Sequence, residues 1–194
     1  MSNPAEEFDC NDCDLRKTCR KPVYGSGNGY IMFISDAPGE TEDLSSIPFS
    51  GLSGRLLRES VGNNGNYLTY AVKCKPPEGR NITNEEIKAC YHHLQEEIET
   101  VKPRLIIFIG KTAYSLHKKI YYSYNIPYLF FYHPSWAIRT LRAKQWSDEI
   151  GGIIRGIKEA NNISININIT INNNINNNIN NVNNSISNIT SKQK

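Results

Sequence analysis

The chain has 194 residues, which is enough for one domain of ordinary size with a buried core. Its 22 Lys and Arg and 19 Asp and Glu give a net charge of +3, so any nucleic-acid binding needs a local basic patch rather than the charge of the whole chain. No apolar run is long enough to cross a membrane and no signal peptide is visible, so we expect no membrane contact and an intracellular location, cytoplasmic or nucleoid-associated.

Short apolar runs alternate with segments of helical spacing along the chain. A capping-box pattern, Thr83 with Glu86, opens the longest of the predicted helices. After a cysteine-bearing loop over 1–22, we expect these elements in order: strand 30–35, loop 36–51, helix 52–60, strand 67–74, a helix from the Thr83 cap to about 100, strand 104–110, helix 111–118, strand 128–136 broken at His133-Pro134, and helix 140–160.

The predicted strands are continuous apolar runs, which is typical of strands covered on both faces. We therefore expect an α/β fold, a three-layer α/β/α sandwich with a central, mostly parallel four-stranded sheet. In such sheets ligands bind beyond the carboxyl ends of the strands. The loops that follow the strands (36–51, 73–80, 110–112, 133–139) are therefore expected to form one shared site.

The C-terminal segment, 161–194, consists almost only of Asn, Ile, Ser and Thr, with two lysines as its only charged residues. Alternation of Ile and Asn has the period of a strand, but low complexity of this kind is more typical of a disordered, aggregation-prone segment. We expect a folded domain over 1–160, whose net charge is +1 once the two tail lysines are set aside, followed by a disordered tail.

Four of the five cysteines form a pattern of Cys10-x2-Cys13, then Cys74, then Cys90. Structural zinc usually takes two tight pairs, which the last two do not make, whereas iron–sulfur clusters tolerate wider spacing. Cys90 can also be read as a small core residue, because it lies on the apolar face of its helix. Cys19 is left over, either as a substitute ligand or as a free thiol.

Several motifs in this order resemble the iron–sulfur branch, often called family 4, of the uracil-DNA glycosylase superfamily. They are "CNDCDLRKTC", "ISDAPGETED", "IPFSGLSGRLL", "VKCKPPEGR" and "HPSWAIR". The resemblance implies a 4Fe-4S cluster on Cys10, Cys13, Cys74 and Cys90. It also implies a monomeric, monofunctional DNA glycosylase that hydrolyses the N-glycosidic bond of a flipped uracil and leaves an abasic site.

The resemblance assigns roles around the base. His133 is expected to donate a hydrogen bond to uracil O2, and Asp36, where the family usually carries Glu, to polarise a water. Phe49 is the expected stacking platform. The substrate side is completed by Ala37, Gly39 and Glu40, with Glu42 and Asp43 either orienting this loop or forming a solvated acidic turn.

DNA contacts are expected after the His133 motif, where the family places its minor-groove wedge. Ser135, Arg139 and Arg142 are the expected DNA-binding residues, joined by Lys144. The apolar wedge would come from Trp136, Ile138 or Leu141. The alternative is that these residues are the amphipathic start of the last helix.

Tyr70 is the largest departure from the family pattern, which usually has Asn at this place to read the uracil edge. A tyrosine offers one donor and one acceptor but not the planar pair of an amide. Asp36, Ser35 in place of the leading Gly, and a short, Tyr-rich stretch between Lys118 and Tyr128 are further departures. An alternative function is therefore a catalytically degenerate member that binds DNA or protein, and a third is an unrelated zinc-stabilised binding module.

Overall fold

The computed structural model describes residues 10–62 and 65–162. The chain divides into two units, Met1–Ile150 and Gly151–Lys194, and each is described by itself. In the second unit residues 151–162 are helical. The predicted disordered tail lies almost wholly outside the described residues, so it and the domain boundary at 160 stay predictions. Among the described helices, none combines the length and apolarity that a bilayer-spanning segment requires.

The first unit is built around a five-stranded sheet of order β1-β3-β2-β4-β5. The strands are β1 (Ser26–Gly27), β2 (Ile31–Ser35), β3 (Asn66–Tyr70), β4 (Leu105–Ile109) and β5 (Tyr128–Phe131). Strands β2 to β5 are parallel, and β1 pairs with β3 in the antiparallel sense. The predicted α/β fold is confirmed, with one strand more than expected. The apolar pattern missed β1 because it is only two exposed residues long.

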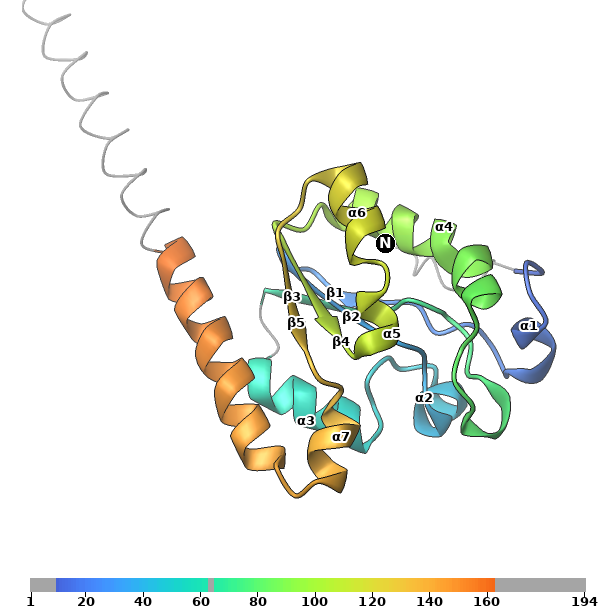
Figure 1. Cartoon of the computed structure of the whole chain (residues 1–194), viewed down its shortest axis with the longest axis horizontal. Coiled ribbons are helices and arrows are strands. Elements are labelled where there is room, and N and C mark those ends of the chain that lie inside the picture. The colour runs from blue at the N-terminus through green and yellow to red at the C-terminus, as the bar shows by residue number, and fades with distance from the viewer. Residues whose placement is uncertain (1–9, 63–64, 163–194) are drawn as a thin grey trace, which may run out of the picture. The chain divides into compact units, whose positions relative to one another are not determined.

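Two layers of helix cover this sheet (Figure 1). One face carries α4 (Asn84–Val101), α5 (Lys111–Tyr114) and α6 (His117–Tyr124), and the other carries α3 (Leu52–Val61) and α7 (Pro134–Arg139). The two remaining helices, α1 (Leu15–Thr18) and α2 (Glu40–Ser45), are short. In the central strand β2 every residue is buried, because helices lie on both of its faces.

The long helix α4 begins as its sequence predicts. The Thr83 hydroxyl accepts from the Glu86 main-chain N–H at 3.2 Å, and the Glu86 carboxylate accepts from the Thr83 N–H at 2.8 Å. This reciprocal pair satisfies two amides at the helix start. The apolar stripe of α4, including Leu94 and Ile98, then packs on the sheet in the main core.

Some predicted boundaries were wrong. The strand expected over 67–74 ends at Tyr70, although Ala71 and Val72 still donate to the Ser35 and Asp36 carbonyls. The helix expected over 111–118 is divided into α5 and α6. The strand expected over 128–136 with a break at His133-Pro134 ends at Phe131, ahead of that break, and residues from Pro134 form α7. Proline suits the first turn of a helix, since it lacks an N–H that would otherwise need a partner there.

Candidate active site and cysteine centre

Asp36 follows directly on β2, at the carboxyl end of the sheet. Its Oδ1 accepts a hydrogen bond of 2.7 Å from the Ala113 main-chain N–H, in the first turn of α5. Burial raises the pKa of Asp36, while hydrogen bonds from Ala113 and Thr112 lower it. A Cβ at Gly110 would lie only 2.9 Å from the carboxylate oxygens. The glycine after β4 therefore lets this carboxylate reach α5, a role that the sequence did not reveal.

The acidic turn after Asp36 is only partly solvated. Glu42 is buried, and its carboxylate accepts from the Gly39 N–H at 3.1 Å and from the Gly51 N–H at 2.8 Å. It thereby joins the start of α2 to the loop that follows Phe49. Of the two alternatives for Glu42, the structure favours the one in which it orients the loop. By contrast, Glu40 is exposed and forms an ion pair with Lys75.

Phe49 and Tyr70 form a buried pair. Their rings are stacked with centroids 4.6 Å apart and planes 7° apart, and each residue is only 3% exposed. The Tyr70 hydroxyl accepts from the Phe49 main-chain N–H at 2.7 Å. The face of Phe49 that meets Tyr70 is therefore unavailable for stacking with any other ring in this conformation.

The backbone of Phe49 is held in an unusual conformation, with φ of +56°. A left-handed phenylalanine is uncommon and costs free energy unless its surroundings enforce it. Gly54 is part of those surroundings, since a Cβ there would lie 2.5 Å from the Phe49 main chain. Strain of this kind is often found in functional loops, and the role of Phe49 as a stacking platform stays a prediction.

His133 is the N-cap of α7 and has a defined tautomer. Its Nδ1 accepts from the Ser135 main-chain N–H at 3.2 Å and lies 2.7 Å from the Ser135 hydroxyl. Burial lowers the pKa of His133 to about 4, helped by Arg139 and opposed by Glu42. The ring is thus neutral at pH 7, and with Nδ1 accepting, its proton is on Nε2.

The segment after α7 is highly exposed. Leu141 is 95% exposed and has a left-handed φ of +59°. Arg139 is also exposed, and the Arg142 guanidinium lies 5.7 Å from the centre of the Trp136 ring. Leu141 thus presents an apolar side chain to solvent near Arg139 and Arg142, and its role as a wedge stays a prediction.

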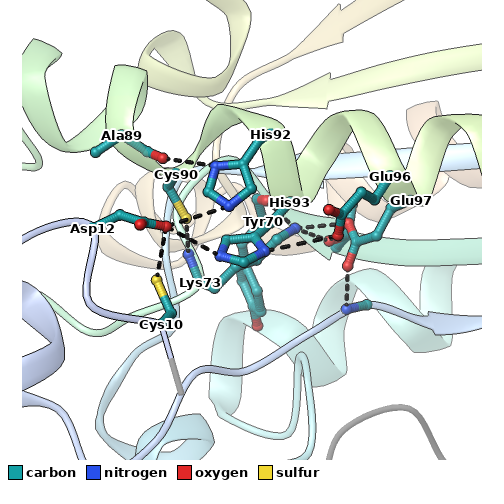
Figure 2. A network of polar contacts seen from close by, with 12 residues as sticks. Cys10, Asp12, Tyr70, Lys73, Ala89, Cys90, His92, His93, Glu96 and Glu97 are labelled. Carbon is teal, nitrogen blue, oxygen red and sulfur yellow. Dashed lines mark hydrogen bonds and ion pairs between the residues drawn. The ribbon is translucent and has the colours of Figure 1, made fainter. Parts of the chain in front are cut away.

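A buried polar network links the end of β3 to α4. The Lys73 ammonium, 1% exposed, lies 2.6 Å from the Glu97 carboxylate and donates to the Thr69 hydroxyl and the Tyr70 carbonyl, each at 2.8 Å. The Lys73 main-chain N–H donates to the Cys90 sulfur at 3.3 Å. Figure 2 shows the main chain of Lys73 beside Cys90 and its side chain reaching Glu97. One residue therefore contacts both Cys90 and Tyr70; Lys73 belongs to the motif "VKCKPPEGR", but the motif gave no sign of these contacts.

The cysteines lie near one another although they come from three separate segments, the N-terminal segment, the segment after β3 and α4. None of the five forms a disulfide. Burial raises the pKa of Cys90, and the neighbouring Cys10 and Cys13 raise it further. A hydrogen bond with Cys19, followed by burial and by Cys90 and Cys13, raises the pKa of Cys74. The four predicted ligands thus lie close enough to influence one another, and Cys19 lies beside them.

Cys10 also belongs to a mixed group that could hold a metal ion. One ligand atom from each of Cys10, Asp12 and His93 lies within 4.8 Å of the others. The Asp12 carboxylate accepts from the Cys10 thiol at 3.2 Å and lies 3.3 Å from His92 Nε2 (Figure 2). Sequence reasoning missed Asp12 and the two histidines, although all three lie within three residues of a predicted cysteine ligand.

Fold and site together define the class of this protein. It is a three-layer α/β domain in which polar loops meet at the carboxyl ends of parallel strands, the usual ligand position in this class. A neutral histidine, a buried aromatic pair and a cysteine centre distinguish the site from others on such sheets.

Comparison with known proteins identifies the family. The profile of the uracil DNA glycosylase superfamily matches residues 22–150, and the chain belongs to this superfamily. The type-4 uracil-DNA glycosylase of Archaeoglobus fulgidus is 38% identical over 115 residues, which are 56% of this chain and 58% of the relative. That of Saccharolobus solfataricus is 40% identical over 120 residues, 57% of this chain and 56% of the relative.

A third type-4 uracil-DNA glycosylase, from Thermotoga maritima, is 39% identical over 113 residues, 55% of this chain and 59% of the relative. The chain therefore spans between 56% and 59% of the length of these curated relatives. The resemblance expected from the sequence motifs is confirmed at the level of the family.

Proposed function

We propose that this protein is a DNA glycosylase that hydrolyses the N-glycosidic bond of uracil in DNA and leaves an abasic site. The family supports the reaction class, and the matched relatives are named uracil-DNA glycosylases. The observation that carries the proposal is His133, a neutral histidine whose Nδ1 accepts from Ser135, so that Nε2 is the donor. A neutral imidazole with its proton on Nε2 can donate a hydrogen bond to a developing anion.

His133 would act on the departing base. When the bond between C1′ and N1 breaks, its electron pair goes to the uracil ring, and much of the charge develops on O2. A hydrogen bond from Nε2 to O2 would be stronger in this transition state than in the ground state, which is the requirement for catalysis. Ser135 would hold the imidazole in the required tautomer, beside its expected contact with DNA.

Asp36 would orient the attacking water. The hydrogen bond from Ala113 fixes one carboxylate oxygen and hence the plane of the group. The water adds its oxygen to C1′ and releases one proton, so an acceptor at this place completes the balance of the hydrolysis. Ala37 and Gly39 lie in the same loop, and Glu40 begins α2 directly after it. We propose that their main chain lines the substrate side, while the Glu40 carboxylate pairs with Lys75 outside it.

Base binding would require a rearrangement of the aromatic pair. A flipped uracil that stacks on Phe49 at the face now covered by Tyr70 must displace the Tyr70 ring. The displaced hydroxyl could then contact the base edge, in place of the amide that the family usually carries. Tyr70 is thus proposed to control which base enters.

The DNA interface would be the end of α7. Leu141 is proposed as the wedge that fills the gap left by the flipped base, because its side chain is 95% exposed. Arg139 and Arg142 flank it and would contact phosphates. The partner is duplex or single-stranded DNA, and the protein would act as a monomer.

The cysteine centre fits a 4Fe-4S cluster held by Cys10, Cys13, Cys74 and Cys90. The convergence of these thiols, of which Cys74 and Cys90 are buried, supports the fit, since thiols so close together are readily deprotonated only with a metal to offset their charge. The N–H of Lys73 on the Cys90 sulfur is a contact typical of cluster ligands. When bound, the cluster would fasten the N-terminal segment to β3 and α4.

The stacked aromatic pair favours a second candidate, a catalytically degenerate member that binds DNA or protein. In this reading Tyr70 fills the base pocket permanently, and only the surface of the 1–160 domain is used. The two candidates differ in whether Tyr70 can leave Phe49.

The test is alkaline strand cleavage with anaerobically purified protein. The substrates carry a single uracil opposite G, opposite A or in a single strand. We expect cleavage at uracil, and a roughly hundredfold or greater loss in His133→Ala with nearly unchanged DNA affinity. Wild-type protein that is brown and folded but inactive would overturn the proposal. Uracil excision gained by Tyr70→Asn in that case would assign the loss to Tyr70, and its absence would leave the binding-module candidate.

A further inference from the structure

The charged residues are distributed unevenly along the chain. Residues 100–147 contain eight Lys and Arg but no Asp or Glu, although the whole chain has 19 acidic residues. The same segment holds 11 of the 19 aromatic residues, counted as Phe, Trp and Tyr. It includes the Tyr-rich stretch that departs from the family pattern and that the proposed glycosylase reaction does not use.

The aromatic side chains of this segment form a continuous row. We define the aromatic row as Tyr121, Tyr128, Tyr114, Phe130, Tyr132 and Trp136. From α6 to the edge strand β5, the ring centroids of Tyr121 and Tyr128 lie 6.0 Å apart, and those of Tyr128 and Tyr114 lie 6.1 Å apart. Each ring is therefore in contact range of the next.

The second half of the row leads to the proposed wedge. The centroids of Tyr114 and Phe130 are 4.9 Å apart, those of Phe130 and Tyr132 5.3 Å, and those of Tyr132 and Trp136 5.0 Å. Arg142 lies over the Trp136 ring. Figure 1 shows the same course in the ribbon, from α6 along β5 to α7. The row thus ends in α7, the helix whose N-cap is His133.

The row is accessible to a ligand. Tyr121 is 41% exposed and Tyr132 49% exposed, and the four other members are partly exposed. Tyr114, Tyr128 and Phe130 also pack against the main core, so the most accessible rings of the row are Tyr121 and Tyr132. Lys118 is exposed and lies three residues before Tyr121 on α6, so the two side chains share one side of that helix.

Rings with cations among them are the chemistry that binds unpaired nucleic acid. Bases offer π-faces for stacking, and phosphates pair with Lys and Arg, whereas the bases of a duplex are already stacked on one another. The complete lack of acidic residues over 100–147 favours a polyanion over a protein partner. We propose that the aromatic row binds single-stranded DNA that continues from the candidate active site. The choice of DNA rests on the proposed function.

The test uses single-stranded DNA without uracil, so that it reports on the row and not on excision. The probe is a fluorescein-labelled oligothymidylate of 12 nucleotides, and the readout is fluorescence anisotropy. We expect Tyr121→Leu/Tyr132→Leu to weaken binding by about tenfold or more, because stacking is worth about 5- to 100-fold per base. Tyr121→Phe/Tyr132→Phe is the matched control, which keeps both rings and should bind within about twofold of wild type.

Charge is tested in a second pair of variants. Lys118→Glu on α6 should weaken binding and lower the slope of log affinity against log salt by about 0.7 for each phosphate that the variant no longer neutralises. Lys88→Glu makes the same charge change at an exposed position of α4, outside the row, and should leave both quantities nearly unchanged. Thermal unfolding of each variant verifies that it is folded.

The outcomes separate this proposal from the proposed function. Equal binding by wild type and the double leucine variant, or no binding by folded wild type, would overturn the aromatic row as a DNA site even if uracil is excised. Binding that depends on the rings and on Lys118 would support it even if no uracil is excised. If Tyr132→Leu prevents the double variant from folding, DNA binding by Tyr121→Leu is compared with binding by Tyr121→Phe. The same outcomes then support or overturn the proposal.

Discussion

The cysteine centre and the Phe49–Tyr70 pair meet at the end of β3, and they differ in how closely they follow the pattern that the family resemblance implies. On one side, Cys74 and Cys90 converge with the N-terminal cysteines at the spacing that the family resemblance implies. On the other, Tyr70 stands where an asparagine is usual and covers Phe49. Lys73 contacts both regions. The cysteine centre therefore agrees with the pattern that the resemblance implies, whereas Tyr70 departs from it.

The largest expected effect concerns the cysteine centre. Cys74→Ser should remove most of the bound iron and the brown colour and lower the melting temperature sharply, because metal binding in such sites contributes directly to folding. Cys19→Ser is the matched control at the neighbouring thiol and should keep iron and stability. Iron content and thermal unfolding measure both. An equal loss of iron in Cys19→Ser would show that Cys19 is a ligand.

The buried lysine gives the next largest effect. Lys73→Met leaves the Glu97 carboxylate buried without its cation, and breaking a buried ion pair in this way costs about 3–5 kcal/mol. Urea unfolding should show this loss as a lower midpoint. The double variant Lys73→Met/Glu97→Gln removes the uncompensated charge and should regain part of the stability. If the double variant is no more stable than the single one, the ion pair is not what Lys73 contributes.

The hydrogen bond between Tyr70 and Phe49 can be removed without removing their ring stacking. Tyr70→Phe keeps the stacked rings but leaves the buried Phe49 N–H without its acceptor, which should cost about 1–3 kcal/mol. Phe131→Leu would not be a suitable control, since it changes the packing at the end of β5. A better one is Tyr122→Phe, which removes the same hydroxyl at an 82% exposed position and should be neutral. Equal stability of Tyr70→Phe and wild type would show that the hydrogen bond is dispensable.

The sequence predicted the elements that depend on local pattern. Strands β2 and β4 are continuous apolar runs, and α4 begins at a reciprocal Thr83–Glu86 pair, so both follow from neighbouring residues. Neighbouring residues did not predict the division between α5 and α6 or the start of α7. These boundaries depend on contacts across the fold, such as the hydrogen bond from Ala113 to Asp36, which no local pattern encodes.

The same distinction holds for the candidate site. The motifs indicated Phe49, Tyr70 and His133 as separate residues, and their roles stay predictions. They did not indicate that Tyr70 stacks on Phe49. Nor did they indicate that a lysine beside a predicted cluster ligand would be fully buried, since lysine is among the residues least often found inside a protein.

The smallest effect near neutral pH, and the one that best isolates the pocket from the cysteine centre, is the pH dependence of stability due to His133. Its pKa falls from an ordinary 6.5 to about 4 on folding, because burial disfavours the charged ring. Between these two values the unfolded chain takes up a proton that the folded protein does not. The free energy of unfolding should therefore fall as the pH is lowered through this window, and it should be unaffected by His133 above it.

Urea unfolding of wild type and His133→Gln at several pH values from neutral to weakly acidic measures this contribution. The variant cannot take up the proton, so its stability should fall less steeply than that of wild type as the pH is lowered. Because both proteins keep the same cysteines, any acid-induced loss of metal is common to the two and cancels in their difference. Parallel pH profiles would contradict the neutral state of His133 in the fold and, with it, the assignment of Nε2 as the donor to the base.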